Sequence, residues 1–454
     1  MVDQASRLLP AAALYPATIF AALALAYALT RTRHLSGRFL ISIIWLRYMM
    51  QVFHDTTHPP IFAGFSLNAL ASLAVCAVGA LVVSNRLRVL GRFPIVFALM
   101  AFIVLSGAIN GAYAGMTETL LKWGYFFVVA LCLYDCIQRD GDARILAPLL
   151  WVFAPLLALQ AISIAIGAGK ASEGDGSVSF IGGFSHEASF SMVLVTCFAV
   201  ASLTPRLNPA LRVGLLTACV IGILAANYRT ALVALAPLAI GYFTFSATRS
   251  FNSRQRLFAG AATLVGAFGV TLLAAWLLRE RMADIANAAS GEVLFQPPGE
   301  FTASERRLLS GRLYLWSSYL DAYLAGDDLR LLFGFGPDAW VGVFGTYAHN
   351  TVISYLYEFG AFGAALIVLV WISMLTRAAR IADPWLRGQL VCAHLGFVVF
   401  NMATMPHWQI EGLILYGLLC GYTVSLTKPK LVPRPSYRRQ ANPALPSLAR
   451  HGDA

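Results

Sequence analysis

Three cationic or titratable side chains occupy polar turns beside apolar stretches, where they could meet an anionic ligand at a membrane surface. Arg229 lies in "AANYRTALVAL", Arg312 opens "RLYLWSSYL", and His349 precedes "NTVISYLYEF". An Arg guanidinium stays charged and can bind two phosphate oxygens at once. A His at the surface can act as a general base or orient a substrate. These residue types would therefore suit chemistry on an anionic lipid headgroup such as a pyrophosphate.

Each of the three also has a structural explanation. The apolar runs that flank Arg229 are short, and fifteen helical residues rise only about 22 Å against a hydrocarbon core of about 30 Å. The turn would then lie below the outer surface, either aimed at a headgroup or reaching up to the headgroup layer. Arg312 by itself would fit an exposed position on a loop helix, and His349 would fit an ordinary interfacial histidine.

A second group of polar residues lies in "GGFSHEASFSMVL", on the side of the membrane where His349 is expected. His186 and Glu187 stand at the start of an expected helix and are candidates for substrate binding. The structural alternative is capping, with Ser185 as the N-cap and Glu187 beside the positive end of the helix.

Three further residues are candidate substrate contacts: Lys122, Asn350 beside His349, and Trp316 in the segment that Arg312 opens. Lys122 would reach a phosphate, but Glu118 stands four residues before it, which favours a structural ion pair on one helix face.

Glu358 follows His349 by nine residues within an apolar segment. On a helix, nine residues rotate the chain by about half a turn and carry it about 13 Å deeper. The two side chains then point to opposite faces and cannot form an acid–base pair. We interpret Glu358 as a buried structural carboxyl, either paired or protonated.

The composition indicates a polytopic all-α membrane protein. The chain is 58% hydrophobic and 12% charged, with a mean hydropathy of +0.69, whereas soluble domains are about 25% charged. No cleavable signal is evident, and the first apolar stretch would be an uncleaved anchor. Runs long enough to approach a span predict 12 or 13 transmembrane helices, with 39–54 the weakest because it contains Arg47. The candidates are 11–29, 39–54, 62–84, 93–110, 117–137, 145–167, 188–203, 213–227, 230–247, 257–278, 350–375, 387–404 and 410–426.

The net charge of +11 resides in short loops and in the tail, which is the positive-inside pattern rather than a nucleic-acid surface. Basic loops predicted to face the cytoplasm are 86–92, 138–144, 204–212, 248–256 and 376–387. The opposite, outer side would hold 55–61, 110–117, 168–187, the turn near 228, the long loop 279–349 and 405–409.

The same reasoning divides the chain into four parts. These are an N-terminal helix bundle (1–278), a long outer loop (279–349), which the resemblance given below makes periplasmic, C-terminal transmembrane helices (350–426) and a basic, disordered cytoplasmic tail (427–454). The loop should contain amphipathic helix, because Thr302 or Ser304 with Glu305 forms a capping-box pattern.

The seven cysteines fall in or beside apolar segments without metal-ligand spacing, so we expect neither disulfides nor metal ligation. Asp140 and Asp142 have D-x-D spacing, but they lie in a short basic loop and are interpreted as a solvated turn. We therefore predict no metal and no cofactor.

Taken in order, these motifs resemble the O-antigen ligase/polymerase (Wzy-C) superfamily. The shared features are the N-Y-R-T-A turn, an Arg-containing loop helix, the Gly-rich "LLFGFGPDAW", and H-N followed by E-x-G-x-x-G, matched by His349, Asn350, Glu358, Gly360 and Gly363. The family turn usually reads S-R, and here it is "NYR". The resemblance covers roughly residues 180–375 by motif and the whole chain by topology.

The resemblance implies a GT-C-like, metal-independent, inverting glycosyltransferase of lipopolysaccharide biosynthesis in the bacterial inner membrane. Its lipopolysaccharide O-antigen ligases transfer a glycan from undecaprenyl pyrophosphate to the lipid A–core oligosaccharide on the periplasmic face. Carried over to this chain, Arg229 and Arg312 would hold the pyrophosphate and His349 would act at the acceptor hydroxyl or the scissile bond. An O-antigen polymerase or a protein O-oligosaccharyltransferase would use the same donor. A transporter is disfavoured because the polar residues gather toward one surface.

Overall fold

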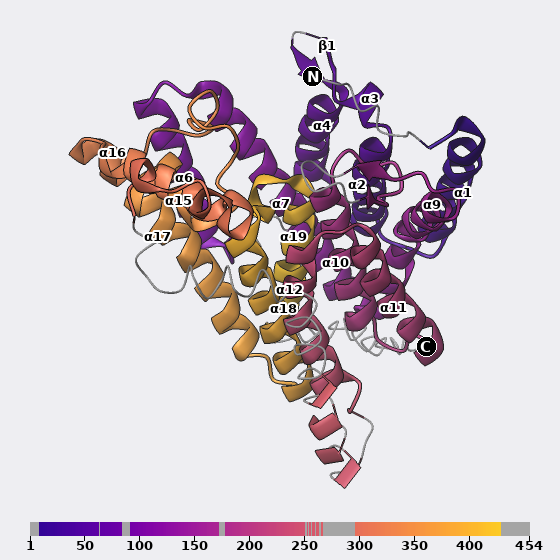
Figure 1. The fold of residues 1–454 in the computed structure, drawn as a ribbon. Helices are drawn as coiled ribbons and strands as arrows, with labels where there is room; N and C mark the ends of the chain where they lie inside the picture. Colours follow the sequence, from indigo (N-terminus) through magenta and orange to yellow (C-terminus); the bar gives the residue numbers. More distant parts are fainter. Residues whose placement is uncertain are drawn as a thin grey trace, which may run out of the picture.

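The structure is a computed structural model of the chain (Figure 1). It describes residues 9–427 except residue 63, the segments 84–90 and 172–177, and most of 250–295. The predicted tail 427–454, apart from its first residue, and most of the predicted span 257–278 and of 279–295 lie outside the described residues.

Helices dominate the described chain. The α-helices are α1 (Ala11–Thr30), α2 (Leu35–Val52), α3 (His54–Thr57), α4 (Leu67–Val82), α6 (Pro94–Ile109), α7 (Tyr113–Asp140), α8 (Ala143–Leu149), α9 (Ala154–Ala165), α10 (Glu187–Leu203), α11 (Pro209–Ala225), α12 (Arg229–Gly241), α15 (Arg312–Leu324), α16 (Asp328–Phe333), α17 (Thr351–Ala379), α18 (Pro384–Ala403) and α19 (Ile410–Leu426). The short 3₁₀ helices are η1 (Leu150–Val152), η4 (Pro298–Glu300), η5 (Glu305–Gly311) and η6 (Pro406–Trp408), and η2 (Tyr242–Ser246) is a turn of π-helix. The strands form two small antiparallel hairpins, β1 (Pro60–Phe62) with β2 (Phe65–Ser66), and β3 (Lys170–Ala171) with β4 (Val178–Ser179).

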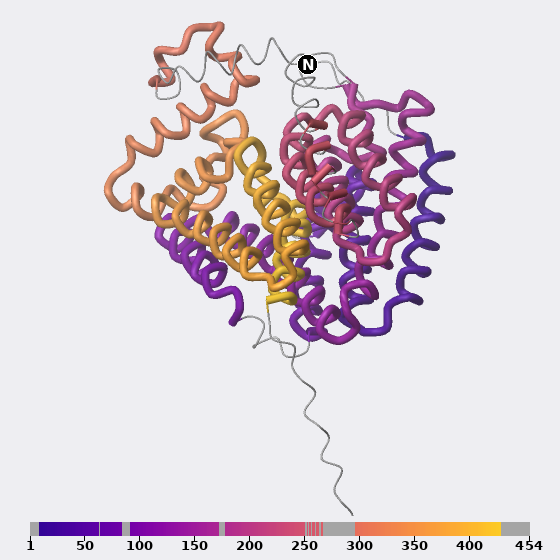
Figure 2. The backbone as a smooth tube through the Cα atoms, turned by 90° about the horizontal axis from the view of Figure 1, so that it is seen from below, coloured from indigo at the N-terminus to yellow at the C-terminus, as the bar shows by residue number. Residues whose placement is uncertain are grey.

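Among the described residues, six helices are long and apolar enough to cross a membrane, and five shorter apolar helices pack with them. This agrees with the predicted all-α polytopic membrane protein; the total of 12 or 13 spans stays a prediction. Seen from below, α17 lies along α6 while α1 forms the opposite edge of the bundle (Figure 2). All seven cysteines are free thiols, as expected from their apolar surroundings.

The predicted weak span, 39–54, corresponds to a helix, α2, with a largely buried face. Its Arg47 is 8% exposed and donates from Nε to Glu411 of α19 over 2.6 Å. Arg47 also donates to Asn68 of α4, and Gln51 donates to the same Glu411 oxygen over 2.8 Å. A charge at such depth is retained when a partner compensates for its lost hydration. This network ties α2, α4 and α19 together.

Loops with basic character meet at one end of the bundle, which we call the basic end. Arg249 pairs with Asp383 over 3.0 Å, joining the loops before α18 and after α12. Asp140 pairs with His34 over 3.2 Å. Asp142 caps α8 and accepts from the hydroxyl of Tyr422, so the interpretation of Asp142 as a merely solvated residue was wrong.

The segments predicted to be periplasmic meet at the opposite end, which we call the outer end. Figure 1 shows α15 and α16 at this end together with α3 and β1. The start of α2 contacts the basic end, because Ser36 donates to Asp135 over 2.7 Å. The last residue of α2, Val52, lies beside Gly183 of the outer end. Helix α2 therefore runs between the two ends.

Helix α17 is broken at Gly360, where φ is 67° and ψ is −171°. The break frees two carbonyls of the preceding turn, and the loop after α16 uses them. Phe335 donates to Tyr357 over 3.0 Å and Gly336 donates to Glu358 over 2.9 Å. A Cβ at Gly360 would overlap the backbone of Leu332. The glycines thus permit a direct backbone contact between α17 and the Gly-rich loop.

Replacing Gly360 by Ala should destabilise the protein, because the left-handed backbone costs about 1–3 kcal/mol for a non-glycine residue and the methyl group would collide with the α16 loop. We expect the apparent Tm of the detergent-solubilised protein to fall by several degrees. Gly345→Ala is the matched control, since no atom lies within 4 Å of a Cβ at that position. Equal melting of the two variants would contradict the assigned contact.

Candidate active site

The N-terminal ends of three helices and the segment before α17 converge at the outer end. They contribute Glu187 from α10, Tyr228 from the turn before α12, Arg312 from α15, and Tyr347 with His349 from the segment before α17. Burial raises the pKa of the phenols of Tyr228 and Tyr347, and the charge of nearby Arg312 offsets part of that rise. The charge of Glu187 acts on the same two phenols in the opposite sense. The four segments therefore bring these side chains within electrostatic range of one another.

His349 is held as a neutral imidazole at this site. Burial is the main cause that lowers the pKa of His349 to about 4, and the charges of Arg312 and His186 lower it further. Its Nδ1 is buried and has no hydrogen-bond partner among the described residues. Its backbone is left-handed, with φ at 52°. A neutral imidazole is able to accept a proton from a hydroxyl that is bound within hydrogen-bonding reach of a ring nitrogen.

Arg312 follows a turn of left-handed residues. The three residues before it, Leu309, Ser310 and Gly311, are all left-handed, with φ of 49°, 60° and 80°. One helical turn after Arg312, the indole of Trp316 donates to the carbonyl of Ala348 over 2.7 Å. This bond attaches α15 to the residue directly before His349. Trp316, predicted to contact substrate, thus acts here as a connection between Arg312 and His349.

The capping box predicted upstream of Arg312 is present. Thr302 donates from its backbone to Glu305 over 2.8 Å, and Glu305 donates from its backbone to the Thr302 hydroxyl over 3.3 Å. These bonds lower the pKa of the Glu305 carboxyl. The turn that follows is the tight η5 rather than an α-helix, and the helix begins only at Arg312.

Arg229 is the first residue of α12 and is exposed. Its guanidinium has no ion pair or hydrogen bond to the described residues. Asn227, two residues earlier, is left-handed with φ at 53°. The next residue, Tyr228, faces the hydroxyl of Thr404. Arg229 therefore directly follows Tyr228, a residue of the site. No described side chain neutralises the charge of Arg229.

His186 is itself the N-cap of α10, so the prediction of Ser185 as the cap was wrong. The Nδ1 of His186 accepts from the backbone of Ala188 over 3.0 Å. Lys170 donates to the Ser185 carbonyl over 2.9 Å and lies 3.7 Å from the carboxylate of Glu187. Because Nδ1 accepts a hydrogen bond, the proton of a neutral His186 resides on Nε2.

Two predicted substrate contacts are occupied by structural interactions. Asn350 caps α17 by accepting from Val352 over 3.0 Å, and its amide donates to the carbonyl of Met402 over 3.1 Å. Lys122 pairs with Glu118 over 2.7 Å, as the structural alternative proposed.

Glu358 also has a structural role, as predicted. The predicted reason, that Glu358 and His349 lie on opposite faces of one helix, does not hold. Helix α17 begins at Thr351, so His349 lies outside the helix and the angular argument does not apply to it. The two carboxylate oxygens of Glu358 accept from the Ser354 hydroxyl and from the backbone of Asp338, the latter over 2.7 Å. Glu358 and His349 are not partners.

Tyr228 and Tyr347 are site residues that the sequence analysis missed. Both lie within two residues of a predicted catalytic residue along the chain. Tyr228 directly precedes Arg229, and Tyr347 is two residues before His349. For Tyr228, the sequence did carry a signal, because this Tyr stands where the family turn usually has Ser before the Arg.

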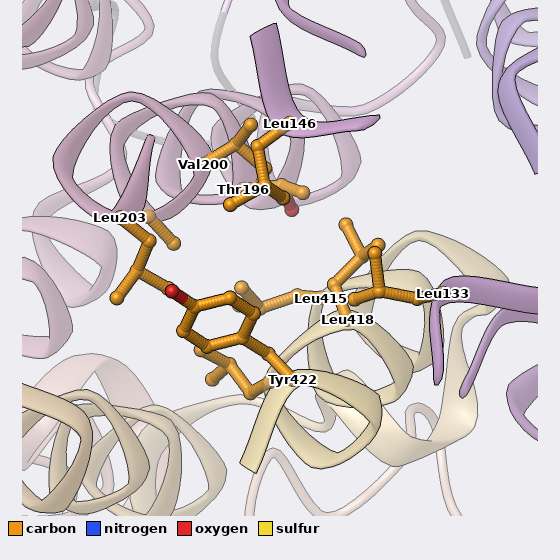
Figure 3. A pocket seen from close by; sticks show the side chains of 10 residues that line it. Leu133, Leu146, Thr196, Val200, Leu203, Leu415, Leu418 and Tyr422 are labelled. Atoms are coloured by element: carbon orange, nitrogen blue, oxygen red, sulfur yellow. The ribbon is translucent and has the colours of Figure 1, made fainter. Parts of the chain in front are cut away.

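A cavity between α7, α8, α10 and α19 does not form part of this site (Figure 3). Its volume is about 10 Å³ and its lining is largely apolar, including Leu133, Leu415 and Leu418. The hydroxyls of Thr196 and Tyr422 in its wall already donate to Met192 and Asp142. The space is a small packing gap in the bundle.

Comparison with known families matches residues 214–368 to a family model described as O-antigen ligase (Wzy-C). The matched segment contains Arg229, Arg312 and His349 together with Glu358 and Gly360. A search among curated proteins finds no match. Family members are membrane glycosyltransferase-like ligases and polymerases. The match over residues 214–368 supports the O-antigen ligase/polymerase superfamily for this chain.

Proposed function

We propose that this protein is an O-antigen ligase of the bacterial inner membrane. It would transfer a glycan from undecaprenyl pyrophosphate to the lipid A–core oligosaccharide at the periplasmic face. The observation that carries this proposal is the proximity of the Arg312 cation to the neutral, half-buried imidazole of His349 within the family segment, where Trp316 of the Arg312 helix donates to the carbonyl of Ala348. The outer end of the bundle would face the periplasm, with 279–349 as the periplasmic loop and the basic end in the cytoplasm.

The proposed reaction is a single displacement. The acceptor hydroxyl oxygen attacks the anomeric carbon of the donor sugar, and its proton passes to the imidazole of His349. The bond between the anomeric carbon and the phosphate oxygen breaks, and the electron pair leaves with undecaprenyl pyrophosphate. Attack from the face opposite the leaving group inverts the anomeric configuration. The products are the extended lipid A–core and the free lipid pyrophosphate.

Arginine suits this leaving group. Negative charge grows on the bridging phosphate oxygen as the bond breaks, and fixed cations stabilise it without reorganisation. Arg229 and Arg312 would supply two guanidinium groups, each able to bind two oxygens. Both lie at the first residue of a helix, where the helix dipole adds to the attraction for an anion.

The lowered pKa of His349 keeps its imidazole unprotonated at neutral pH, and it also makes the imidazole a weaker base than an ordinary histidine. The unprotonated imidazole can take the proton of an incoming hydroxyl. The proximity of Arg312 opposes its protonation in the resting site. Once the pyrophosphate neutralises Arg312, protonation of His349 would become easier, which places proton uptake after donor binding.

Arg229→Ala, Arg312→Ala and His349→Ala should each reduce transfer by about 10²-fold or more, since one lost charge donor or general base costs about that much. The measurement is in vitro transfer from polyprenyl-pyrophosphate glycan to purified lipid A–core, after checking membrane insertion. Arg307→Ala is the matched control, because this Arg is exposed five residues before Arg312.

The acceptor decides between related activities. Transfer to a second lipid-linked glycan instead of lipid A–core would identify a polymerase, and transfer to a protein would identify an O-oligosaccharyltransferase. Full transfer by all three site variants would contradict the assigned residues.

The pH dependence should follow the neutral form of His349. With its pKa lowered to about 4, kcat/KM should stay level between pH 7.5 and 5.5 and fall only as the pH approaches 4, where the imidazole becomes protonated. A half-maximal point near 6.5, the ordinary pKa of His, would contradict the proposed burial of a neutral base.

Transfer should not require a divalent metal, since the proposed mechanism assigns charge stabilisation to the two arginines. A chelator in the assay is expected to leave the rate within a factor of about two. Inhibition that added magnesium reverses would mean that a metal shares this role.

A further inference from the structure

His349 depends on neighbouring rings for its orientation. Its left-handed backbone and unpartnered Nδ1 leave no described hydrogen bond at that nitrogen to fix the plane of the imidazole. The ring instead packs against Tyr347, with 4.1 Å between the ring centroids. The torsion that turns an imidazole is intrinsically broad. A productive orientation therefore requires that Tyr347 itself be held.

Tyr347 is held by an aromatic stack. Its ring lies on Trp408 with the centroids 5.4 Å apart and the planes at 21°. Trp340 presents an edge to both rings, at 6.2 Å from Tyr347 and 5.6 Å from Trp408. The ammonium of Lys122 lies 4.3 Å from the centre of the Trp408 ring. Such contacts restrain ring planes as well as burying area.

The stack is joined to the half-buried carboxylate of Asp338. The indole of Trp408 donates to a carboxylate oxygen of Asp338 over 3.4 Å. Asp338 is left-handed, with φ at 59°, and its backbone donates to Glu358 over 2.7 Å. Glu358 is 3% exposed and also accepts from Ser354. A continuous series of contacts thus leads from Glu358 to His349.

We propose that Glu358, Asp338, Trp408 and Tyr347 form a positioning chain that fixes the imidazole plane of His349 for the transfer reaction. This inference rests on the proposed function of His349 as the base. None of the four residues need touch the substrate. Each acts through the next, and Lys122 contributes by holding Trp408 rather than by binding a phosphate.

The proposal explains why a Glu follows the His–Asn pair into an apolar helix. Burying a carboxylate is costly unless it is hydrogen-bonded, and here it fixes the backbone of the Gly-rich loop at Asp338. A misplacement of a reacting group by about 1 Å can cost about 10²-fold in rate. Holding the loop therefore has a direct effect on the proposed chemistry at His349.

The first test compares Trp408→Leu, which removes the stack, with Trp408→Phe, which keeps an aromatic face. We expect Trp408→Leu to lower kcat by about 10-fold or more with the donor KM nearly unchanged, and Trp408→Phe to recover most of the rate. The acid limb of kcat/KM should also move up in pH, since loosening Tyr347 lets water reach His349 while Arg312 and His186 stay in place. Trp151→Leu, a half-exposed indole that packs on Tyr27, is the control with full activity.

The second test is a double-mutant cycle. If Trp408 acts through His349, Trp408→Leu should cause little further loss in a His349→Ala background. Additive losses, or a Trp408→Leu enzyme with unchanged kcat and pH profile, would overturn the positioning chain. Tyr347→Leu interrupts the same chain at its middle and serves if Trp408→Leu does not fold.

The two proposals fail in distinguishable ways. If His349→Ala transfers glycan at the parent rate, the proposed function of His349 is wrong. If His349→Ala is inactive but both Trp408→Leu and Tyr347→Leu behave as the parent, only the positioning chain is wrong.

Discussion

The contact between the broken turn of α17 and the Gly-rich loop after α16 is the constraint on which the outer end depends. Gly360 interrupts the helix, and the carbonyls of Tyr357 and Glu358 accept from Phe335 and Gly336 instead of from their own helix. A helix that continued normally would have used these carbonyls itself. The loop is therefore anchored backbone to backbone, which fixes the position of the segment leading to His349 more firmly than side-chain packing would.

Around that anchor, burial and charge act together on the site. Arg312 approaches through three successive left-handed residues, and Trp316 attaches its helix to the carbonyl of Ala348. Left-handed non-glycine residues are costly and gather at functional sites. Here they also occur at His349 and two residues before Arg229.

Long apolar runs predicted the helices well, and the ion pair of Arg47 with Glu411 shows how the helix of the weak span 39–54 keeps a charge inside the bundle. Sequence reasoning predicted less about the polar residues. The capping box of Thr302 and Glu305 could be read locally because its bonds lie within four residues. The cap of α10 could not be assigned correctly, because Ser185 and His186 are both suitable and only the observed backbone geometry selects His186.

By itself, the sequence determined the membrane-protein class, the segments that meet at each end, and the identity of Arg229, Arg312 and His349 as candidates, because hydropathy and local motifs are properties of neighbouring residues. Only the tertiary structure decided that the helix of Arg312 is bonded to the residue before His349, that Tyr228 and Tyr347 lie near Arg312, and that Lys122 lies over Trp408. These contacts join residues up to a few hundred positions apart. Their existence depends on how the helices pack, a property that no local pattern encodes.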